Sequence, residues 1–228
     1  MAGAEAIAVD ASADDWSAAD LAWINSPSNP TGEVLTDDQI LQVINWGRKN
    51  NAVVASDECY LSFSSNAKSI LELAKGDNTG LLAVHSLSKS SNMAGYRAAF
   101  IVGDPKLIDQ IRQIRKHAGL MVAGPIQAGM IAALSDNKHV VEQVNRYSNR
   151  REILSSALKA AGFTIEHSKA GLYIWCAKGE NCFKTVDWFA SRGILVTPGS
   201  FYGDDNFVRV ALTATDENIM KASERIKS

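Results

Sequence analysis

The residues best suited to chemistry are an amide, a carboxylate, a phenol and an amine, each placed shortly after an apolar run. They are Asn29, Asp57, Tyr60 and Lys89. A lysine amine condenses with carbonyl compounds, and burial favours the neutral amine that does so. A carboxylate that faces a pyridine nitrogen keeps that nitrogen protonated, so the ring can accept electrons. Together these groups predict a site for an aromatic aldehyde with a pyridine ring.

Hydroxyl and guanidinium groups nearby would bind a phosphate group on the same ligand. Ser86 and Arg97 have the right chemistry, because arginine binds phosphate through paired, charge-assisted hydrogen bonds. Tyr60 and Asn29 could hydrogen-bond an oxygen on the ring. Taken singly, each residue fits a turn, a helix cap or a solvated surface position. Their joint occurrence within 69 residues, from Asn29 to Arg97, is what indicates a site.

The elements that must position these side chains are short apolar runs that alternate with longer amphipathic segments. The runs predicted as buried strands are EAIAVD (5–10), LAWINS (21–26), AVVASD (52–57), LLAVHS (81–86) and AAFIVG (98–103). Thr36 and Gln39 form a capping box for a helix over 36–50. Strand, helix and strand in succession predict a mostly parallel sheet, and ligands bind beyond the carboxyl ends of its strands.

Helical patterns dominate from about residue 104, over 104–119, 125–135 and 139–162. The first of these helices is predicted to be amphipathic. Its dry side is formed by Leu107, Ile108, Ile111 and Ile114. Its solvent-exposed side is basic and is formed by Arg112, Arg115 and Lys116. Short strands at 163–167, 171–176, 194–198 and 207–212 and helices at 183–193 and 216–226 follow. The predicted fold class is α/β, with a partial large domain over 1–145 and a smaller C-terminal domain over 146–228.

Arg209 is a charged residue inside the apolar run FVRVAL, on the same strand face as Phe207 and Ala211. A buried cation requires an anion, so this position predicts an anionic ligand. The alternative is an arginine on an edge strand whose side chain reaches water.

Three segments, SPSNPTG, SDECY and SLSKSSNMAGYR, occur in this order and closely resemble the class I and II aminotransferases of fold type I, which bind pyridoxal 5'-phosphate (PLP). VTPGSFYG and NFVRVAL are similar to small-domain motifs of that family. Among its members, the chain most resembles the succinyldiaminopimelate aminotransferases of lysine biosynthesis. The resemblance implies an incomplete PLP-dependent transferase-like large domain, whose mostly parallel sheet has helices on both faces, and a smaller α/β domain.

The resemblance also implies a role for each residue of the motifs. Lys89 would be the Schiff-base lysine, and Asp57 would face the pyridinium nitrogen. Tyr60 and Asn29 would bind the 3-oxygen of the cofactor.

Further roles follow from the same resemblance. Ser86 and Arg97 would bind the cofactor phosphate, Arg209 would bind the substrate α-carboxylate, and Asn29 would also contact the substrate. The reaction implied is amino transfer between an amino acid, such as N-succinyl-diaminopimelate, and 2-oxoglutarate. The intact enzyme would be a cytoplasmic homodimer.

The sequence departs from the family before Asn29. Members usually have a substrate-covering segment, a glycine-containing phosphate loop and an aromatic residue stacked on the cofactor, and none is visible here. Trp16 and Trp23 do not fit the stacking position. The chain therefore resembles the carboxy-terminal portion of an aminotransferase. We expect residues 1–20 to be poorly anchored or to pair in a way unlike the family, because their usual strand partners are missing. We also expect weak PLP binding and little turnover.

Composition excludes several other classes of function. The 23 basic and 25 acidic residues give a net charge of -2, so no strong field attracts nucleic acid or anionic lipid. No apolar run reaches the roughly 18 to 20 residues that span a membrane. The three cysteines and four histidines lack the spacing of a metal site. Small molecules are therefore the predicted partners.

Other activities match parts of the same pattern. Ser86-Leu-Ser-Lys89 fits the S-x-x-K motif of penicillin-binding serine hydrolases, but Ser90-Ser91-Asn92 lies too close to it and Lys184-Thr185-Val186 lacks the required glycine. A different PLP enzyme of fold type I, such as a C–S lyase or an acyl-condensing synthase, shares the same cofactor residues. A non-catalytic fragment is the third alternative.

Overall fold

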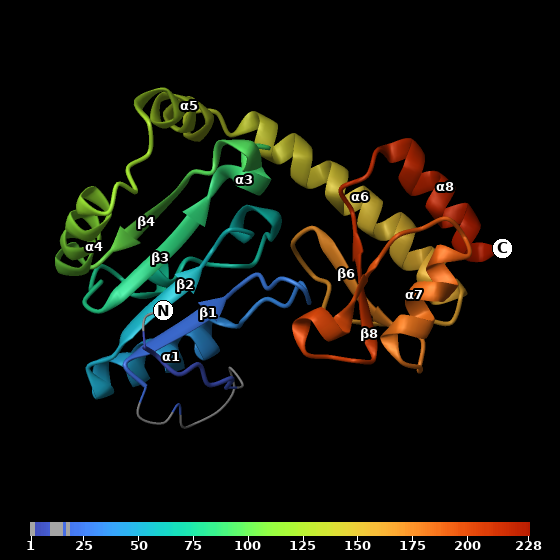
Figure 1. Cartoon of the computed structure of the whole chain (residues 1–228), viewed down its shortest axis with the longest axis horizontal. Coiled ribbons are helices and arrows are strands. Elements are labelled where there is room, and N and C mark those ends of the chain that lie inside the picture. Colours follow the sequence, from blue (N-terminus) through green and yellow to red (C-terminus); the bar gives the residue numbers. More distant parts are fainter. Residues whose placement is uncertain (1–2, 10–15, 17–18) are drawn as a thin grey trace.

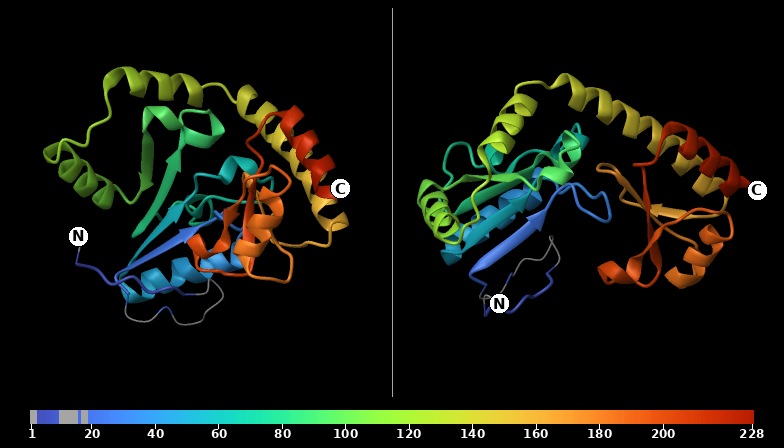
Figure 2. Two further views of the ribbon diagram at one scale, coloured as in Figure 1. Left: turned by 45° about the vertical axis from the view of Figure 1, so that its right-hand side comes forward. Right: turned by 45° about the horizontal axis from the view of Figure 1, so that its top comes forward.

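The chain folds into two units, each built on a four-stranded sheet and connected by one long helix (Figure 1). The computed structural model describes residues 3–9, 16 and 19–228. The view in Figure 2 that brings the right-hand side forward shows the second unit beside the ends of the first two strands. The predicted α/β class with a mostly parallel first sheet is confirmed.

The first sheet has the strand order β1-β2-β3-β4. Its strands are β1 (Leu21–Asn25), β2 (Val53–Asp57), β3 (Leu81–Ser86) and β4 (Ala99–Gly103). The first three are parallel, and β4 is antiparallel to β3. Because Asn25 pairs with Asp57 in register, the carboxyl ends of β1 and β2 meet at one edge of the sheet.

Helix α1 (Asp37–Asn50) connects β1 to β2 and confirms the predicted capping box. The Thr36 side chain accepts a hydrogen bond from the Gln39 backbone, and the Gln39 side chain accepts one from the Thr36 backbone. The helix packs closely on β2 at Gly47, where a side-chain Cβ would lie 2.6 Å from Val54. Shorter helices follow the next two strands: α2 (Ile70–Leu73) and α3 (Leu87–Ser90).

Helix α6 (Lys138–Ala160) joins the two units. Near its start, His139 contacts Ser91, which lies two residues after the predicted catalytic lysine, with 2.9 Å between Nε2 and Oγ. The other ring nitrogen of His139 lies 3.1 Å from Asp136. Farther along, Leu154, Ala157 and Leu158 are buried in the core of the second unit.

The second sheet is antiparallel and has the strand order β5-β6-β8-β7. Its strands are β5 (Thr164–Glu166), β6 (Tyr173–Ala177), β7 (Thr197–Pro198) and β8 (Phe207–Ala211), and its helices are α7 (Cys182–Ala190) and α8 (Asp216–Lys227). The strand predicted at 194–198 is wrong over its first three residues. Leu195 is 93% exposed, and only the two residues of β7 pair with β8.

The strand predicted at 5–10 is also wrong in its described part. Residues 5–9 form no strand and are exposed, because the described sheet offers them no neighbouring strand. Trp16, by contrast, is buried and packs on Trp46 with 5.8 Å between ring centres. The expectation of poor anchoring over 1–20 therefore fails at Trp16, and residues 1–2, 10–15 and 17–18 lie outside the described part.

Helices α4 (Pro105–His117) and α5 (Gly124–Leu134) follow β4. The dry side predicted for α4 is covered only in part: Leu107, Ile108 and Ile111 are half-buried, whereas Ile114 is 67% exposed, and no residue of α4 is fully buried. No helix among the described residues is both long and apolar enough to cross a membrane.

Candidate active site

The loop after β1 carries Asn29 and is fixed at both ends. The Asn29 backbone N–H donates to Oδ1 of Asn25 at 2.9 Å. Gly32 has a left-handed φ of 69°, and a Cβ there would lie 2.7 Å from the carbonyl oxygen of Ala170. The Gly32 carbonyl accepts the N–H groups of Lys169 and Ala170 at 3.1 and 3.2 Å. The loop of the first unit is thereby bound to the second unit.

The segment after β2 places a carboxylate, a thiol and a phenol at the same edge. Asp57 Oδ1 accepts the backbone N–H of Cys59 at 3.1 Å, and the Asp57 carbonyl accepts the Asn25 amide at 3.0 Å. Burial, together with the adjacent Asp57 carboxylate, raises the pKa of the Cys59 thiol to about 12. The thiol is therefore neutral near pH 7 and is a poor nucleophile.

Tyr60 lies buried between the two units, with 7% of its surface exposed. Its ring packs edge-to-face against Tyr173 of β6, with 6.1 Å between ring centres. Burial and the phenol of Tyr173 raise the pKa of Tyr60 above its ordinary value. The Tyr60 hydroxyl is therefore protonated near pH 7 and can donate a hydrogen bond.

Glu58, between Asp57 and Cys59, points into the protein and is 2% exposed. Its Oε2 lies 3.1 Å from Nε2 of His85 on β3, and its Oε1 accepts the Ile70 N–H at 2.8 Å. Burial alone would raise the pKa of Glu58, but the contacts with His85 and Ile70 hold it below its ordinary value. This pair connects the ends of β2 and β3.

The segment after β3 turns into the single-turn helix α3, which carries Lys89. Ser86 caps that helix: its Oγ accepts the Ser88 N–H at 3.1 Å, and its hydroxyl donates to the Ser88 hydroxyl at 2.8 Å. Lys89 is partly buried. Arg97, farther along, has a left-handed φ of 52°, and its guanidinium donates to the Ala94 carbonyl at 2.9 Å. Both side chains border the same cavity.

Arg209 approaches this edge from the second unit. β8 lies between β6 and β7, so the alternative of an edge-strand arginine is wrong. Nη1 of Arg209 donates to Oδ1 of Asn29 at 2.8 Å, across 180 positions of sequence. The guanidinium carbon lies 4.1 Å from the centre of the Tyr173 ring. Among the described residues, no carboxylate forms an ion pair with Arg209.

One cavity of about 490 Å³ brings most of the predicted site residues together. Six of the seven line it: Asn29, Asp57, Tyr60, Ser86, Lys89 and Arg97. Arg209 is connected to it through Asn29. The volume lies within the range of roughly 300 to 1,000 Å³ usual for small-molecule sites. The donor set fits PLP, because it offers an amine, a carboxylate, a phenol, an amide, a hydroxyl and a guanidinium.

Several lining residues were missed by the sequence analysis. Trp23, which was judged unfit for stacking, lines the cavity and is 59% exposed. Trp23 and Asn25 lie two apart on β1 and so on the same face, and both line the cavity, but Asn25 was not a predicted site residue and no sequence signal marked Trp23. Ser88, two residues after Ser86, also lines it. Tyr173 does not line the cavity but packs against Tyr60. It belongs to no motif in the sequence, because its contacts are with residues distant along the chain.

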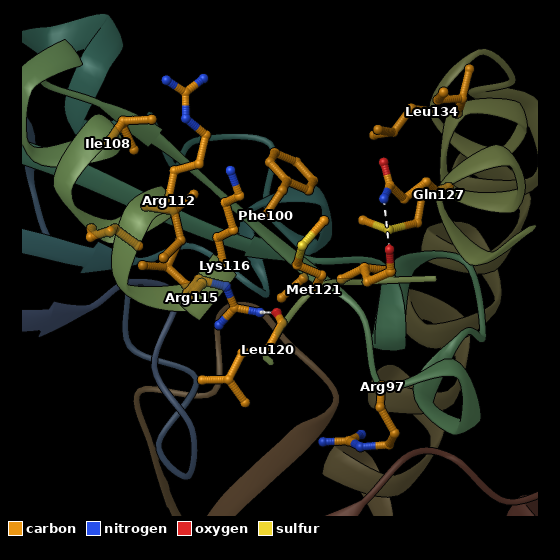
Figure 3. Close-up of a pocket in the computed structure, with 17 residues that line it drawn as sticks. Arg97, Phe100, Ile108, Arg112, Arg115, Lys116, Leu120, Met121, Gln127 and Leu134 are labelled. Atoms are coloured by element: carbon orange, nitrogen blue, oxygen red, sulfur yellow. Dashed lines mark hydrogen bonds between the residues drawn. The ribbon is translucent and has the colours of Figure 1, made fainter. Parts of the chain in front are cut away.

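A second cavity, of about 810 Å³, lies elsewhere and is mainly apolar (Figure 3). It is bordered by β4, α4 and α5, and it shares only Arg97 with the set of predicted site residues. Ile108, Phe100 and Leu134 line it, together with the basic side chains Arg112, Arg115 and Lys116 (Figure 3). The candidate chemistry therefore belongs to the smaller cavity.

Three curated relatives share this sequence over most of its length. "Probable aminotransferase Rv1178" of Mycobacterium tuberculosis is 51% identical, over 90% of this chain and 51% of the relative. "4-dedimethylamino-4-oxo-anhydrotetracycline transaminase OxyQ" of Streptomyces rimosus is 49% identical, over 90% and 58%. An "LL-diaminopimelate aminotransferase" of Dehalococcoides mccartyi is 33% identical, over 92% and 56%. The chain thus spans between 51% and 58% of the length of these relatives.

Structural and family comparisons agree with these relatives. The solved aminotransferase from Staphylococcus aureus matches 91% of this chain and 57% of its own, with a TM-score of 0.83 and 27% identity. The family described as Aminotransferase class I and II matches residues 6–226. The particular resemblance to succinyldiaminopimelate aminotransferases is not found among these relatives: two are named for other substrates, and the name of Rv1178 gives none. The chain belongs to the class I and II aminotransferases, a family of PLP-dependent enzymes.

Proposed function

We propose that this chain carries the cofactor and substrate residues of a PLP-dependent aminotransferase. The observation that supports the proposal best is the single cavity shared by Lys89, Asp57, Tyr60 and Asn29. An amine, a carboxylate and two hydrogen-bond donors from three separate strand ends would be an unusual coincidence in a merely structural cavity. Membership of the aminotransferase family adds independent support.

Each residue would contribute a distinct step. PLP, when bound, supplies a ring that accepts the electrons released at the α-carbon of an amino acid. Lys89 would attach the cofactor through Nζ and then move the proton at the substrate α-carbon. Asp57 would hold the proton on the ring nitrogen. Tyr60, whose raised pKa keeps its hydroxyl protonated, and Asn29 would donate hydrogen bonds to the 3-oxygen.

Binding of the two anionic groups falls to the remaining residues. Ser86 and Arg97 would bind the cofactor phosphate, with the guanidinium supplying a charge-assisted contact. Arg209 would bind the substrate α-carboxylate. Its guanidinium already donates to Asn29, and no carboxylate of the described chain neutralises it. This leaves its charge available for an anionic ligand.

We further propose N-succinyl-diaminopimelate as the amino donor, 2-oxoglutarate as the acceptor and lysine biosynthesis as the setting. The 33% identity with an LL-diaminopimelate aminotransferase supports a donor of this chemical kind. OxyQ, which is more similar to this chain, is named for an oxo-tetracycline substrate. The amino donors that are assayed must therefore include amines that correspond to such ketones. We also propose that the chain has two domains, 1–145 and 146–228. The intact enzyme would be a homodimer, and this chain alone would show little turnover.

The test is PLP titration followed by borohydride reduction and peptide mapping. We expect the label on Lys89 in the wild-type chain and no label in Lys89→Ala. The exposed lysine variant Lys75→Ala is the matched control and should label normally. Label spread evenly over surface lysines would contradict the proposed role of Lys89. Transfer of an ¹⁵N-labelled amino group to 2-oxoglutarate would separate an aminotransferase from a lyase or synthase.

A further inference from the structure

Tyr173 belongs to the second unit, but its side chain packs against the first. It begins β6, pairs there with Ala211, and is 8% exposed. It forms one buried apolar cluster with Leu172 beside it and with Tyr60 and Phe63 of the first unit. A residue so placed contacts both halves of the candidate active site.

Two contacts of Tyr173 reach residues with different proposed roles. Its ring centre lies 6.1 Å from that of Tyr60, at an edge-to-face angle of 67°. The guanidinium carbon of Arg209 lies 4.1 Å above the same ring. Tyr173 is thus in contact with a proposed cofactor ligand and with the proposed carboxylate ligand at once.

The contact with Arg209 explains how a cation is held there without a counter-ion. Nε of Arg209 is buried and has no hydrogen-bond partner among the described residues, and no carboxylate pairs with the guanidinium. The face of an aromatic ring attracts a cation without neutralising its charge. Tyr202 adds a second ring at 5.0 Å. The guanidinium is therefore oriented, and its charge remains available.

We propose that Tyr173 is a positioning residue that couples Tyr60 on the cofactor side to Arg209 on the substrate side. This inference rests on the proposed aminotransferase function, because that function gives the two coupled residues their roles. The edge-to-face ring contact orients Tyr60, and the cation–π contact orients the Arg209 guanidinium. Both effects reside in the ring of one side chain and are lost together when that ring is removed.

The experiment uses two variants of the full chain and three readouts. Tyr173→Phe removes only the hydroxyl, whereas Tyr173→Leu removes the ring as well. The first readout is the rate of Arg209 modification by phenylglyoxal, and the second is the rate of Tyr60 nitration, both without cofactor and both mapped by mass spectrometry. The third is PLP affinity measured by absorbance. Tyr202→Leu is the control that removes a ring near Arg209 only.

We expect Tyr173→Phe, which keeps the ring, to leave Arg209 modification and Tyr60 nitration close to the wild-type rates. Tyr173→Leu should accelerate Arg209 modification by about fivefold, the size of a cation–π contact. It should also accelerate Tyr60 nitration and weaken PLP binding by about two- to tenfold, the size of an aromatic pair, because Tyr60 loses its neighbouring ring. Tyr202→Leu should accelerate Arg209 modification less and leave Tyr60 nitration unchanged.

Unchanged rates at both Arg209 and Tyr60 in Tyr173→Leu would overturn the coupling, whatever the cofactor does. If the wild-type chain binds no PLP but Tyr173→Leu still changes both modification rates, the coupling is supported and the proposed function is contradicted. Equal acceleration at both residues in Tyr202→Leu would also overturn the proposal, because it would assign the effect to general loosening.

Discussion

Helices α4 and α5 of the first unit are buried far less than the helices of the second unit. In the second unit, α6, α7 and α8 all contribute to a closed core, in which Leu158 and Phe189 are fully buried and Ile226 is 2% exposed. In the first unit, α4 has no buried residue and α5 has only Met130. The apolar side of α4 instead borders the cavity of about 810 Å³ between α4, α5 and β4 (Figure 3).

This difference shows what an apolar stripe in a sequence predicts. The stripe of α4 is as regular as those of the second unit, and its isoleucines lie on one side of the helix. Burial, however, requires a second surface, which only another part of a fold can supply. The stripe thus predicts which side of a helix faces away from water when a partner surface is present. It does not predict that the described chain contains that surface.

The strongest test of the comparison removes one apolar side chain from each unit. Phe189→Ala should lower the free energy of unfolding by about 3 to 5 kcal/mol, because it leaves a cavity in a closed core. Ile131→Ala on α5, where the side chain is 67% exposed, should cost less than about 0.5 kcal/mol. Urea unfolding measures both. Similar costs for the two variants would mean that the α5 face is covered in solution.

A smaller effect concerns the polar pair that connects β2 and β3 in the first unit. His85→Leu removes the imidazole beside the buried Glu58 carboxylate and should cost about 2 to 3 kcal/mol at pH 7. The pKa of Glu58 in the folded chain is lowered from 4.5. The stabilisation that its ionised carboxylate gives the folded state is therefore complete above pH 4.5 and is lost as the pH falls through the pKa of the folded state. Stability of the wild type should therefore decline below about pH 4.5.

Glu58→Gln is the matched variant for this pair, since it keeps an oxygen for the Ile70 N–H and removes the charge. The difference in unfolding free energy between wild type and Glu58→Gln should shrink as the pH falls below 4.5. Thermal unfolding at pH 3 to 7 measures it. A difference that grows on acidification would show that folding raises the pKa of this carboxyl.

The smallest effect concerns the loop that connects the units. Gly32→Ala places a Cβ at a left-handed φ and 2.7 Å from the Ala170 oxygen, so it should cost about 2 kcal/mol. Gly179 has a similar φ of 75° but open space around it, and Gly179→Ala should cost about 1 kcal/mol. Equal costs in urea unfolding would mean that the contact between Gly32 and the second unit yields without strain.

Much of the candidate site followed from local sequence. Asp57 and Lys89 lie just beyond the ends of apolar parallel strands, and such ends meet at one edge for geometric reasons. The capping box at Thr36 is likewise a local signal. What could not be predicted depends on partners far away in sequence. The bond between Arg209 and Asn29 spans 180 positions, and Tyr173 has no motif of its own.

The errors have the same origin. The run at 5–9 has a strand-like composition, but a strand exists only when a neighbour pairs with it, and the described sheet provides none. The run at 194–198 has an exposed Leu195 and pairs over two residues only. The single-turn helices α2 and α3 are too short for a periodic signal, although α3 carries Lys89.

Helix α6 makes the site sensitive to small rotations. Its 23 residues extend about 35 Å, with His139 fixing the start near Ser91 and the far half embedded in the core of the second unit. If the helix rotated by about 5° about its first turn, its far end would move by about 3 Å. A displacement of that size exceeds what the 2.8 Å bond between Arg209 and Asn29 tolerates. The spacing between the two sides of the site therefore depends on the orientation of this helix as well as on the direct contacts between the units.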